Sequence, residues 1–446
     1  MTGQNGHGFT KDNMLQLSEV KGEPEWVRER RQQAWEAWEN IPMPTMKDEE
    51  WRRTDISKID FNRFRPFNNS NGHQFESVDQ LPDATRSLVT ASDEEAARGG
   101  FLVQGDSRVR LTELSEELRE QGVIFMGLEQ AVEEHPDLVK EYLFTKVMQP
   151  NYSKFAALNG AFWSGGAFLY VPRGVEVEVP VQAFFSVTEP ELAIFQHNLI
   201  VLEENASAQF VEAFQSENQE YETLNNGITE IFLNDNSRLN FTSVQNWGKN
   251  VYDLSNKRAH LGRDAKITWI VSTFGGKLTK NHIDSVCEGE GSEAKAMGLY
   301  FLDGAQHLDV GVLLKLNNPH TFADSLYKGA LKNKSRSIFQ GLIKIEKEAQ
   351  YVNAFLENKN LLLTKGARAD SIPVLEIRAD EVKASHGATV GRIDENQMYY
   401  LMSRGLSREQ AQRIIVAGFF EDVIRHIGAQ STKDMILQLI EQKIRS

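Results

Sequence analysis

Residues 262–301 read G-R-D-A-K-I-T-W-I-V-S-T-F-G-G-K-L-T-K-N-H-I-D-S-V-C-E-G-E-G-S-E-A-K-A-M-G-L-Y-F and decide the fold class of this chain. The stretch contains three short runs rich in β-branched and aromatic residues, at Lys266–Phe274, Asn281–Cys287 and Lys295–Phe301. Turn-forming residues separate them, as in Glu288–Ser292. Short runs of this composition, bounded by turn residues, predict β-strands.

The same pattern extends in both directions, from Phe155 to Ile377. Further runs lie at Ala167–Val171, Val175–Val181, Ala183–Val187, Leu199–Leu202, Ser207–Ala213, Gly227–Leu233, Arg238–Val244, Leu308–Lys315 and Ser337–Ile345. So many strands without long helices between them exclude a doubly wound α/β fold. A β-sandwich, a propeller or a parallel β-helix remain. Propeller blades would repeat a tryptophan or glycine signature, and none is visible, whereas the degenerate rungs of a β-helix need no crisp repeat.

Helical patterns flank this β region. An apolar stripe at helical spacing predicts a helix over residues 23–40, and two more are predicted at 114–121 and 127–148, the latter split by Pro136. In the C-terminal part, residues 394–397 and 407–410 have the capping-box form, and Gly405 ends the first helix. We therefore expect a mostly helical N-terminal domain at 1–155 with disordered first residues, a β core at 156–377 and a helical C-terminal domain at 378–446.

The composition of the chain excludes several classes of partner and activity. A formal net charge of −14 argues against nucleic acid and against an anionic membrane surface as partners. The first residues lack an apolar signal segment, and the single cysteine, Cys287, fits a reducing compartment, so we expect a cytoplasmic protein. One thiol cannot hold a conventional iron–sulfur cluster, which needs several. No phosphate-binding G-x-x-x-x-G-K-[ST] loop is present, so we expect no ATP hydrolysis by this chain.

Several motifs along the chain point to one family. They are Pro42-Met43-Pro44 followed by Asp48–Thr54, then Leu326–Leu331, Gly341–Ile343, Asn360–Leu363 and Ala367–Pro373, and finally Arg378–Gly405, which contains S-H-G-A-T-V-G. Together they resemble the SufB/SufD family of scaffold subunits in the SUF iron–sulfur cluster assembly system. Within that family the resemblance is to the SufD branch, because the SufB branch is expected to be richer in cysteine.

This resemblance implies a mainly β fold, a right-handed parallel β-helix core with helical domains on both sides. It implies a scaffold subunit that is not an enzyme, pairs with a SufB homologue and binds the ATPase SufC through its C-terminal helical domain. A homodimer is an alternative state for the chain without its sister, and the sequence does not decide between the homodimer and the heterodimer. The chain alone would hold no cofactor, and iron or a nascent Fe–S cluster would be shared with the partner subunit.

His386 is the first candidate site residue. Its small neighbours leave the imidazole open to a partner or a metal. By resemblance it is an iron or cluster ligand at the contact with the SufB homologue; otherwise it is a hydrogen-bonding residue of a strand. Many family members have a cysteine two residues earlier, where this chain has Ala384.

Two weaker candidates are the pairs His282/Asp284 and His307/Asp309. Residues two apart on a strand face the same way, so each pair could present an imidazole and a carboxylate to a metal, although a polar pair on the solvent face of a rung is the favoured interpretation. Cys287 is more simply a packing residue than a sulfur carrier. The alternatives left open are a SufB-type paralogue, a stand-alone β-helix enzyme acting on polysaccharide, and a purely structural interaction protein.

Overall fold

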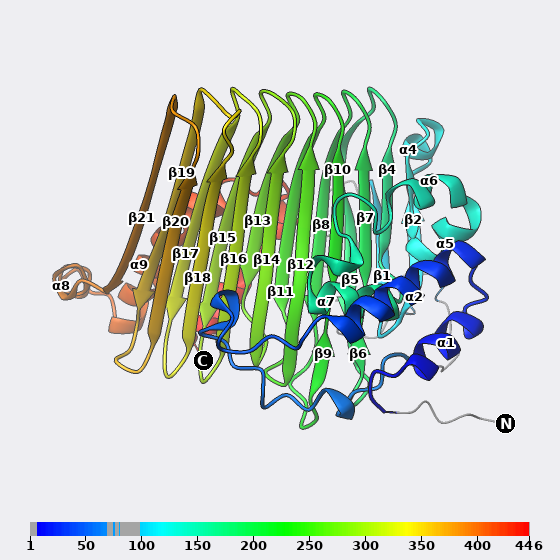
Figure 1. Cartoon of the computed structure of the whole chain (residues 1–446). Helices are drawn as coiled ribbons and strands as arrows, with labels where there is room; N and C mark the ends of the chain where they lie inside the picture. Colours follow the sequence, from blue (N-terminus) through cyan, green and yellow to red (C-terminus); the bar gives the residue numbers. More distant parts are fainter. Residues whose placement is uncertain (1–6, 69–74, 76–79, 81–98, 446) are drawn as a thin grey trace.

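The structure is a computed structural model that describes residues 7–68, 75, 80 and 99–445. In Figure 1 the strands stand side by side in one long stack, with the N-terminal helices gathered at one end and the C-terminal helices (red) behind the strands. The mainly β fold with a parallel β-helix core and helices on both sides is confirmed. The predicted disorder of the first residues concerns 1–6, which lie outside the described residues.

Two sheets form the stack. The first has the order β2 (Arg108–Leu114), β1 (Gly100–Gly105), β5 (Glu176–Ser186), β8 (Ser207–Gln215), β11 (Arg238–Asn246), β13 (Lys266–Thr273), β15 (Glu293–Leu302), β17 (Phe322–Leu331), β19 (Val352–Leu362), β21 (Val382–Arg392). The second has the order β20 (Arg368–Ile377), β18 (Arg336–Ile345), β16 (His307–Leu316), β14 (Leu278–Cys287), β12 (Val251–Leu261), β10 (Ile228–Leu233), β7 (His197–Leu202), β4 (Ala167–Val171), β3 (Ile124–Gly127), with β6 (Ala193–Ile194) and β9 (Thr223–Asn225) beside it.

Consecutive strands from β10 onward alternate between the two sheets, and all their neighbours are parallel. One corner of the solenoid repeats a residue with left-handed backbone, at Asn205, Asn236, Asp264, Gly291, His320 and Tyr351. These corners are 27 to 31 residues apart. Asn, Asp and Gly adopt positive φ at low cost, so the sequence favours a turn there. The uneven spacing explains why no repeat is visible in the sequence.

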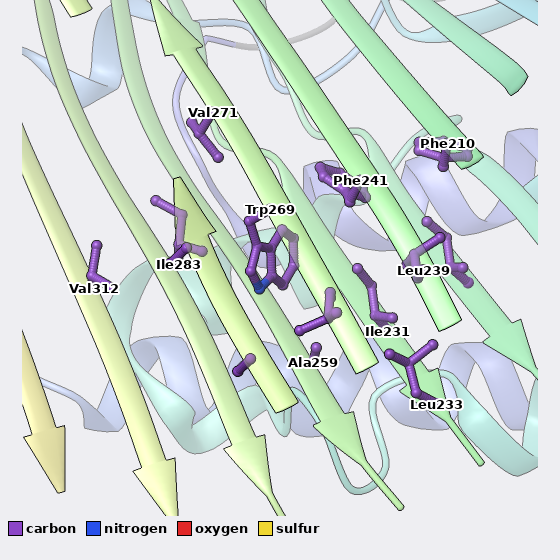
Figure 2. Packing of buried hydrophobic residues seen from close by; sticks show 14 of the residues in the cluster. Phe210, Ile231, Leu233, Leu239, Phe241, Ala259, Trp269, Val271, Ile283 and Val312 are labelled. Atoms are coloured by element: carbon purple, nitrogen blue, oxygen red, sulfur yellow. The ribbon is translucent and has the colours of Figure 1, made fainter. Parts of the chain in front are cut away.

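The core fills the space between the two sheets. Figure 2 shows Phe210, Phe241 and Trp269 on successive strands β8, β11 and β13, facing aliphatic side chains such as Ile231 and Ile283 of the opposite sheet. The ring centroids of Phe210 and Phe241 are 5.5 Å apart, and those of Phe241 and Trp269 are 4.9 Å apart. This stacking of aromatic rings along the axis stabilises neighbouring rungs in one register.

A reciprocal glycine–tyrosine pair joins β15 to β17. Gly298 lies opposite Tyr327, and Tyr300 lies opposite Gly329. A Cβ atom at position 298 would come 2.0 Å from the Tyr327 ring, and a Cβ atom at 329 would come 2.0 Å from the Tyr300 ring. Each ring therefore occupies the space that a side chain on its partner strand would need. The Tyr300 hydroxyl group reaches one strand further and donates to Asn360 Oδ1 (2.6 Å).

One ion pair lies inside this apolar core. Lys257 Nζ of β12 is 2.5 Å from Glu212 Oε1 of β8, and the two side chains are 7% and 0% exposed. Ser243 and Asn198 also donate to the Glu212 carboxylate. The sequence pattern did not reveal β12, because a charged side chain occupies a position that faces the core.

No run was predicted for β1, β2, β3, β6, β9, β17, β19 or β20 either. The predicted runs at Val175–Val181 and Ala183–Val187 form one strand, β5, with a register shift between Val177 and Val181. The solenoid also extends past both predicted boundaries of its core, since β1 pairs with β5 and β21 pairs with β19. These segments are strands because their backbones pair with neighbouring strands of the sheets. The composition of a segment does not show this pairing, so strands such as β17 and β19 were not predicted.

The described helices include the predicted ones, together with two that were not predicted, at Lys11–Val20 and Lys154–Phe162. They are α1 (Lys11–Val20), α2 (Glu25–Asn40), α4 (Glu116–Glu120), α5 (Leu128–Glu134), α6 (Pro136–Tyr142), α7 (Lys154–Phe162), α8 (Glu395–Ser403), α9 (Arg408–Ile424) and α10 (Gln430–Arg445), with short 3₁₀ turns η1 (Glu49–Trp51), η2 (Phe61–Arg63) and η4 (Pro150–Tyr152). Pro136 begins α6 and splits the helical region as predicted. Among the helices that the structure describes, none has the length and apolar character that crossing a bilayer requires.

Candidate functional site at the open end of the solenoid

The two ends of the solenoid differ. At the N-terminal end both sheets finish in an antiparallel pair, β1 with β2 and β4 with β3. At the C-terminal end the last strands are β20 and β21, and each pairs with a described strand on one side only. Residues of β20 and β21 are half-buried or exposed, whereas the preceding strands β18 and β19 alternate such residues with buried ones. This C-terminal end is called the open end below.

His386 lies in the middle of β21, at the open end. It is exposed and stands opposite the buried Leu356 of β19. Side chains alternate along a strand, so His386 is on the same side as Val382 and Ala384, which pack against the core. The ring has no hydrogen-bond partner among the described residues. The imidazole therefore faces the uncovered continuation of the solenoid interior, where an added subunit would meet it.

The two edge strands offer different hydrogen-bonding capacity. Arg368 N donates to Ser335 O, so the backbone N–H and C=O groups of the even-numbered residues of β20 point toward β18. The backbone groups of the odd-numbered residues, including Pro373, point toward the open side. Proline has no N–H group, and it is typical of edge strands that avoid further pairing. On β21 the same alternation points the backbone groups of the even-numbered residues away from β19, among them those of His386, and none of these residues is proline. Backbone groups of β21 are thus available to a further strand.

The pair His282/Asp284 lies on β14, on the outer face of the second sheet. Asp284 accepts a hydrogen bond from the Tyr152 hydroxyl group (2.5 Å), and Arg258 Nη1 is 3.4 Å from the same oxygen. Burial raises the pKa of Asp284, opposed by Arg258. Burial lowers the pKa of His282 to about 3, with a further contribution from Lys280. The Asp284 carboxylate thus joins the sheet to Tyr152.

The pair His307/Asp309 lies on the neighbouring strand β16. Asp309 accepts hydrogen bonds from Thr54 Oγ1 (2.6 Å), Lys280 Nζ (2.9 Å) and Gln340 Nε2 (2.8 Å). Burial alone would raise the pKa of Asp309, but Lys280 and these hydrogen bonds hold it below the usual value. Burial lowers the pKa of His307 to about 4. The carboxylate oxygens that a metal would need already have protein donors.

No group of three or more His, Cys, Asp or Glu side chains is placed to hold a metal ion within the described ranges. His386 lies on the last rung, whereas the pairs on β14 and β16 are covered by Tyr152 and Thr54 of the N-terminal part of the chain. Sequence reasoning did not identify Thr54, Lys280 and Gln340 as partners of Asp309. The motif Asp48–Thr54 was the available signal, but its target is more than 250 residues away.

Cys287 ends β14 inside the solenoid, and its side chain is 0% exposed. Burial raises the pKa of the thiol to about 12. A thiol that is neutral and enclosed is a poor nucleophile and a poor metal ligand. The prediction that Cys287 is a packing residue agrees with this environment.

The C-terminal helices pack on the outer face of the first sheet. Val416, Phe420 and Ile436 of α9 and α10 are buried against residues such as Phe301. Ser407 and Gln410 form the predicted capping box of α9, while at α8 the Asp394 side chain accepts only from Asn396 N. In contrast, α8 contacts α9 and exposes three large side chains: Tyr399 (76%), Tyr400 (57%) and Met402 (40%).

Comparison with known proteins gives consistent results along the whole chain. Residues 185–419 match the family described as "SUF system FeS cluster assembly, SufBD core domain", and residues 16–183 match "SufBD protein N-terminal region". The chain is 30% identical over 432 residues to the iron–sulfur cluster assembly protein SufB of Bacillus subtilis, covering 96% of this chain and 91% of that protein. Identity and coverage are the same for iron–sulfur cluster assembly SufBD family proteins of Staphylococcus epidermidis and Staphylococcus haemolyticus. The chain therefore belongs to the SufBD family of iron–sulfur cluster assembly proteins.

Proposed function

We propose that this chain is the SufD-type scaffold subunit of a cytoplasmic SUF complex and has no catalytic activity of its own. Its family membership supports the assembly role. The SufD type is supported by its single thiol, because Cys287 is enclosed and cannot pass sulfur from one protein to another. The similarity to the SufB protein of Bacillus subtilis favours the alternative, a SufB-type paralogue.

The observation that carries the proposal is the open end with His386 on its last strand. A SufB homologue docks there, adds a strand to the free edge of β21 and covers the imidazole. His386 then shares iron or a nascent cluster with a cysteine of that partner, since a neutral imidazole is a good ligand for iron. In the absence of the sister subunit, a second copy of this chain can occupy the same edge as a homodimer.

A SufC-type ATPase binds the C-terminal helices. The exposed aromatic side chains Tyr399 and Tyr400 of α8 support this site, because Tyr is enriched where protein partners dock. The chain lacks a phosphate-binding loop, so ATP hydrolysis needs this second protein. Arg413 Nε of α9 is 2.6 Å from Glu441 Oε2 of α10, and this ion pair joins the two helices.

The test is co-expression of this chain with its SufB and SufC homologues, followed by affinity isolation of the complex and measurement of its Fe–S absorbance after reconstitution. We expect a stable ternary complex, and a His386→Ala complex of unchanged composition that assembles much less cluster. Ser385→Ala is the matched control, because Ser385 precedes His386 on β21 and faces the other side of the sheet.

Two results would contradict the proposal. Isolation of the chain without either partner would remove the scaffold assignment. Equal cluster yield from the His386→Ala and wild-type complexes would remove the ligand role of His386 and leave a structural subunit.

A further inference from the structure

The segment that follows α2 has a role that the proposed function does not explain. Residues 41–54 leave the N-terminal helices and run across the outer face of the second sheet, which Figure 1 shows as the dark blue trace in front of the strands. These residues are called the strap, and Glu50–Thr54 its tip. The first part of the strap is exposed, including Met43 (37%) and Met46 (53%), whereas Thr54 is 1% exposed.

Thr54 is the first anchor of the tip. Its hydroxyl group donates to Asp309 Oδ2 (2.6 Å) and lies 2.9 Å from His307 Nε2. A hydroxyl group has one proton, so once it donates to the carboxylate its oxygen accepts from the imidazole N–H. The lowered pKa of His307 keeps the ring neutral, as this arrangement allows. One side chain thus ties the strap to two residues of β16.

The backbone carbonyl of Glu50 is the second anchor. It accepts from Lys280 Nζ of β14 (2.8 Å) and from Gln340 Nε2 of β18 (3.1 Å). The same two donors also bind Asp309, which stands on the strand between them. Lys280 lies 4.8 Å from the centre of the Trp51 ring, within the range of a cation–π contact. The tip is therefore fixed to three adjacent strands through one shared polar cluster.

These three strands lie directly before the open end. Gln340 of β18 is in register with Ile372 of β20, the last strand of its sheet. β20 pairs with β18 alone among the described strands. β20 contacts β21 at the end of the solenoid, so any shift of β18 relative to β16 moves β20 and, through it, β21, whose free edge a partner chain would meet. Asp309, bound by donors from β14, β18 and the strap, opposes such a shift.

We infer that the strap tip is a clasp that holds the last rungs of the solenoid in the arrangement required for docking of the sister scaffold. This inference rests on the proposed function for the identity of the partner. The motif D-E-E-W-R-R-T at 48–54 then has a positioning role: it acts on the docking edge through β16 and β18, without touching iron or cluster.

The experiment uses the full chain with Thr54→Val, which keeps a β-branched side chain and removes the hydroxyl group. We expect faster amide hydrogen exchange in residues 48–54 and in β16, β18 and β20. We also expect the Kd for the SufB homologue to rise about fivefold, as it would if the closed clasp were populated in about a fifth of the molecules. Thr45→Val is the matched control, because Thr45 is an exposed threonine of the same strap whose contacts are with Lys47 and Asp48 of the strap itself.

Unchanged exchange in β18 and β20 together with an unchanged Kd would overturn the inference. If Thr54→Val does not fold, Gln340→Leu decides by the same two readouts, since Gln340 is only half-buried and links Glu50 O to Asp309. A wrong proposed function would give a different result. The wild-type chain would then bind no SufB homologue, while the difference in hydrogen exchange between Thr54→Val and wild type would persist.

Discussion

Gly298→Ala tests whether the interlocking of β15 and β17 sets the stability of the solenoid. The added Cβ atom would lie 2.0 Å from the Tyr327 ring, whereas ordinary contacts begin at 3.4 Å. The ring must therefore move by about 1.4 Å, but it is 1% exposed and has Phe339 at 5.1 Å between ring centroids. Overpacking of a filled core costs about 1–3 kcal/mol, and we expect the upper end of this range because both partners are enclosed.

The measurement is the free energy of unfolding from guanidinium chloride titrations followed by far-UV circular dichroism. Gly418→Ala in α9 is the control, since a Cβ atom there meets nothing within 4 Å and alanine favours a helix by about 1 kcal/mol over glycine. A double-mutant cycle isolates the clash. Tyr327→Ala alone should cost about 3–5 kcal/mol, and adding Gly298→Ala to it should cost less than about 1 kcal/mol. Gly298→Ala within about 0.5 kcal/mol of wild type, or strictly additive changes, would refute the reasoning.

Three further predictions concern buried groups elsewhere in the core. Lys257→Met should lower the free energy of unfolding by about 3–5 kcal/mol by leaving the Glu212 carboxylate buried without its cation, and Lys257→Met with Glu212→Leu should recover most of it; equal losses in the single and double variants would count against this. Cys287 should resist thiol reagents at pH 8 in the folded protein and react only in denaturant, so labelling within minutes under native conditions would contradict its burial. His260 has both ring nitrogens buried without hydrogen-bond partners in the part of the chain that the structure describes, and burial lowers its pKa to about 4. Because the folded pKa is below the unfolded value of about 6.5, the unfolded state binds the proton first and stability falls as pH drops from 6.5 to 4. His260→Phe should reduce that fall, measured as the difference in unfolding free energy between pH 7 and pH 5, and an unchanged difference would exclude His260 as its source.

Local patterns identified the elements whose formation depends on near neighbours. The run Ala167–Val171 is strand β4 at the predicted boundaries, and Ser407 with Gln410 forms the predicted cap. Helix α9 marks the limit of such patterns. Its apolar residue Ile414 is 50% exposed, whereas Val416 and Phe420 are buried. Apolar residues occur on more than one side of this helix, so periodicity could not choose the face that meets the sheet.

Some residues of the candidate site were likewise identified from local sequence, and others were not. His386 was found from its small neighbours and its motif, which are both local. The partners of Asp309 were not found, because Thr54, Lys280 and Gln340 come together only when three rungs are stacked and the strap crosses them. The weak metal pairs looked plausible in sequence since their spacing places both side chains on one face. What else binds those side chains depends on residues far away in the chain.

The sequence by itself determined that this chain is mainly β with helices on both sides, that one thiol is present, and that His386 stands in an open, small-residue strand. Composition, the alternation of apolar and polar residues, and turn residues are patterns over a few neighbouring positions, so they can be recognised without a structure. Only the tertiary structure decided which strands end the solenoid, which edge is closed by Pro373, and that the strap is fastened beside that edge. These features arise from the stacking of rungs 27 to 31 residues apart, and the spacing varies too much for the register to be read from the chain.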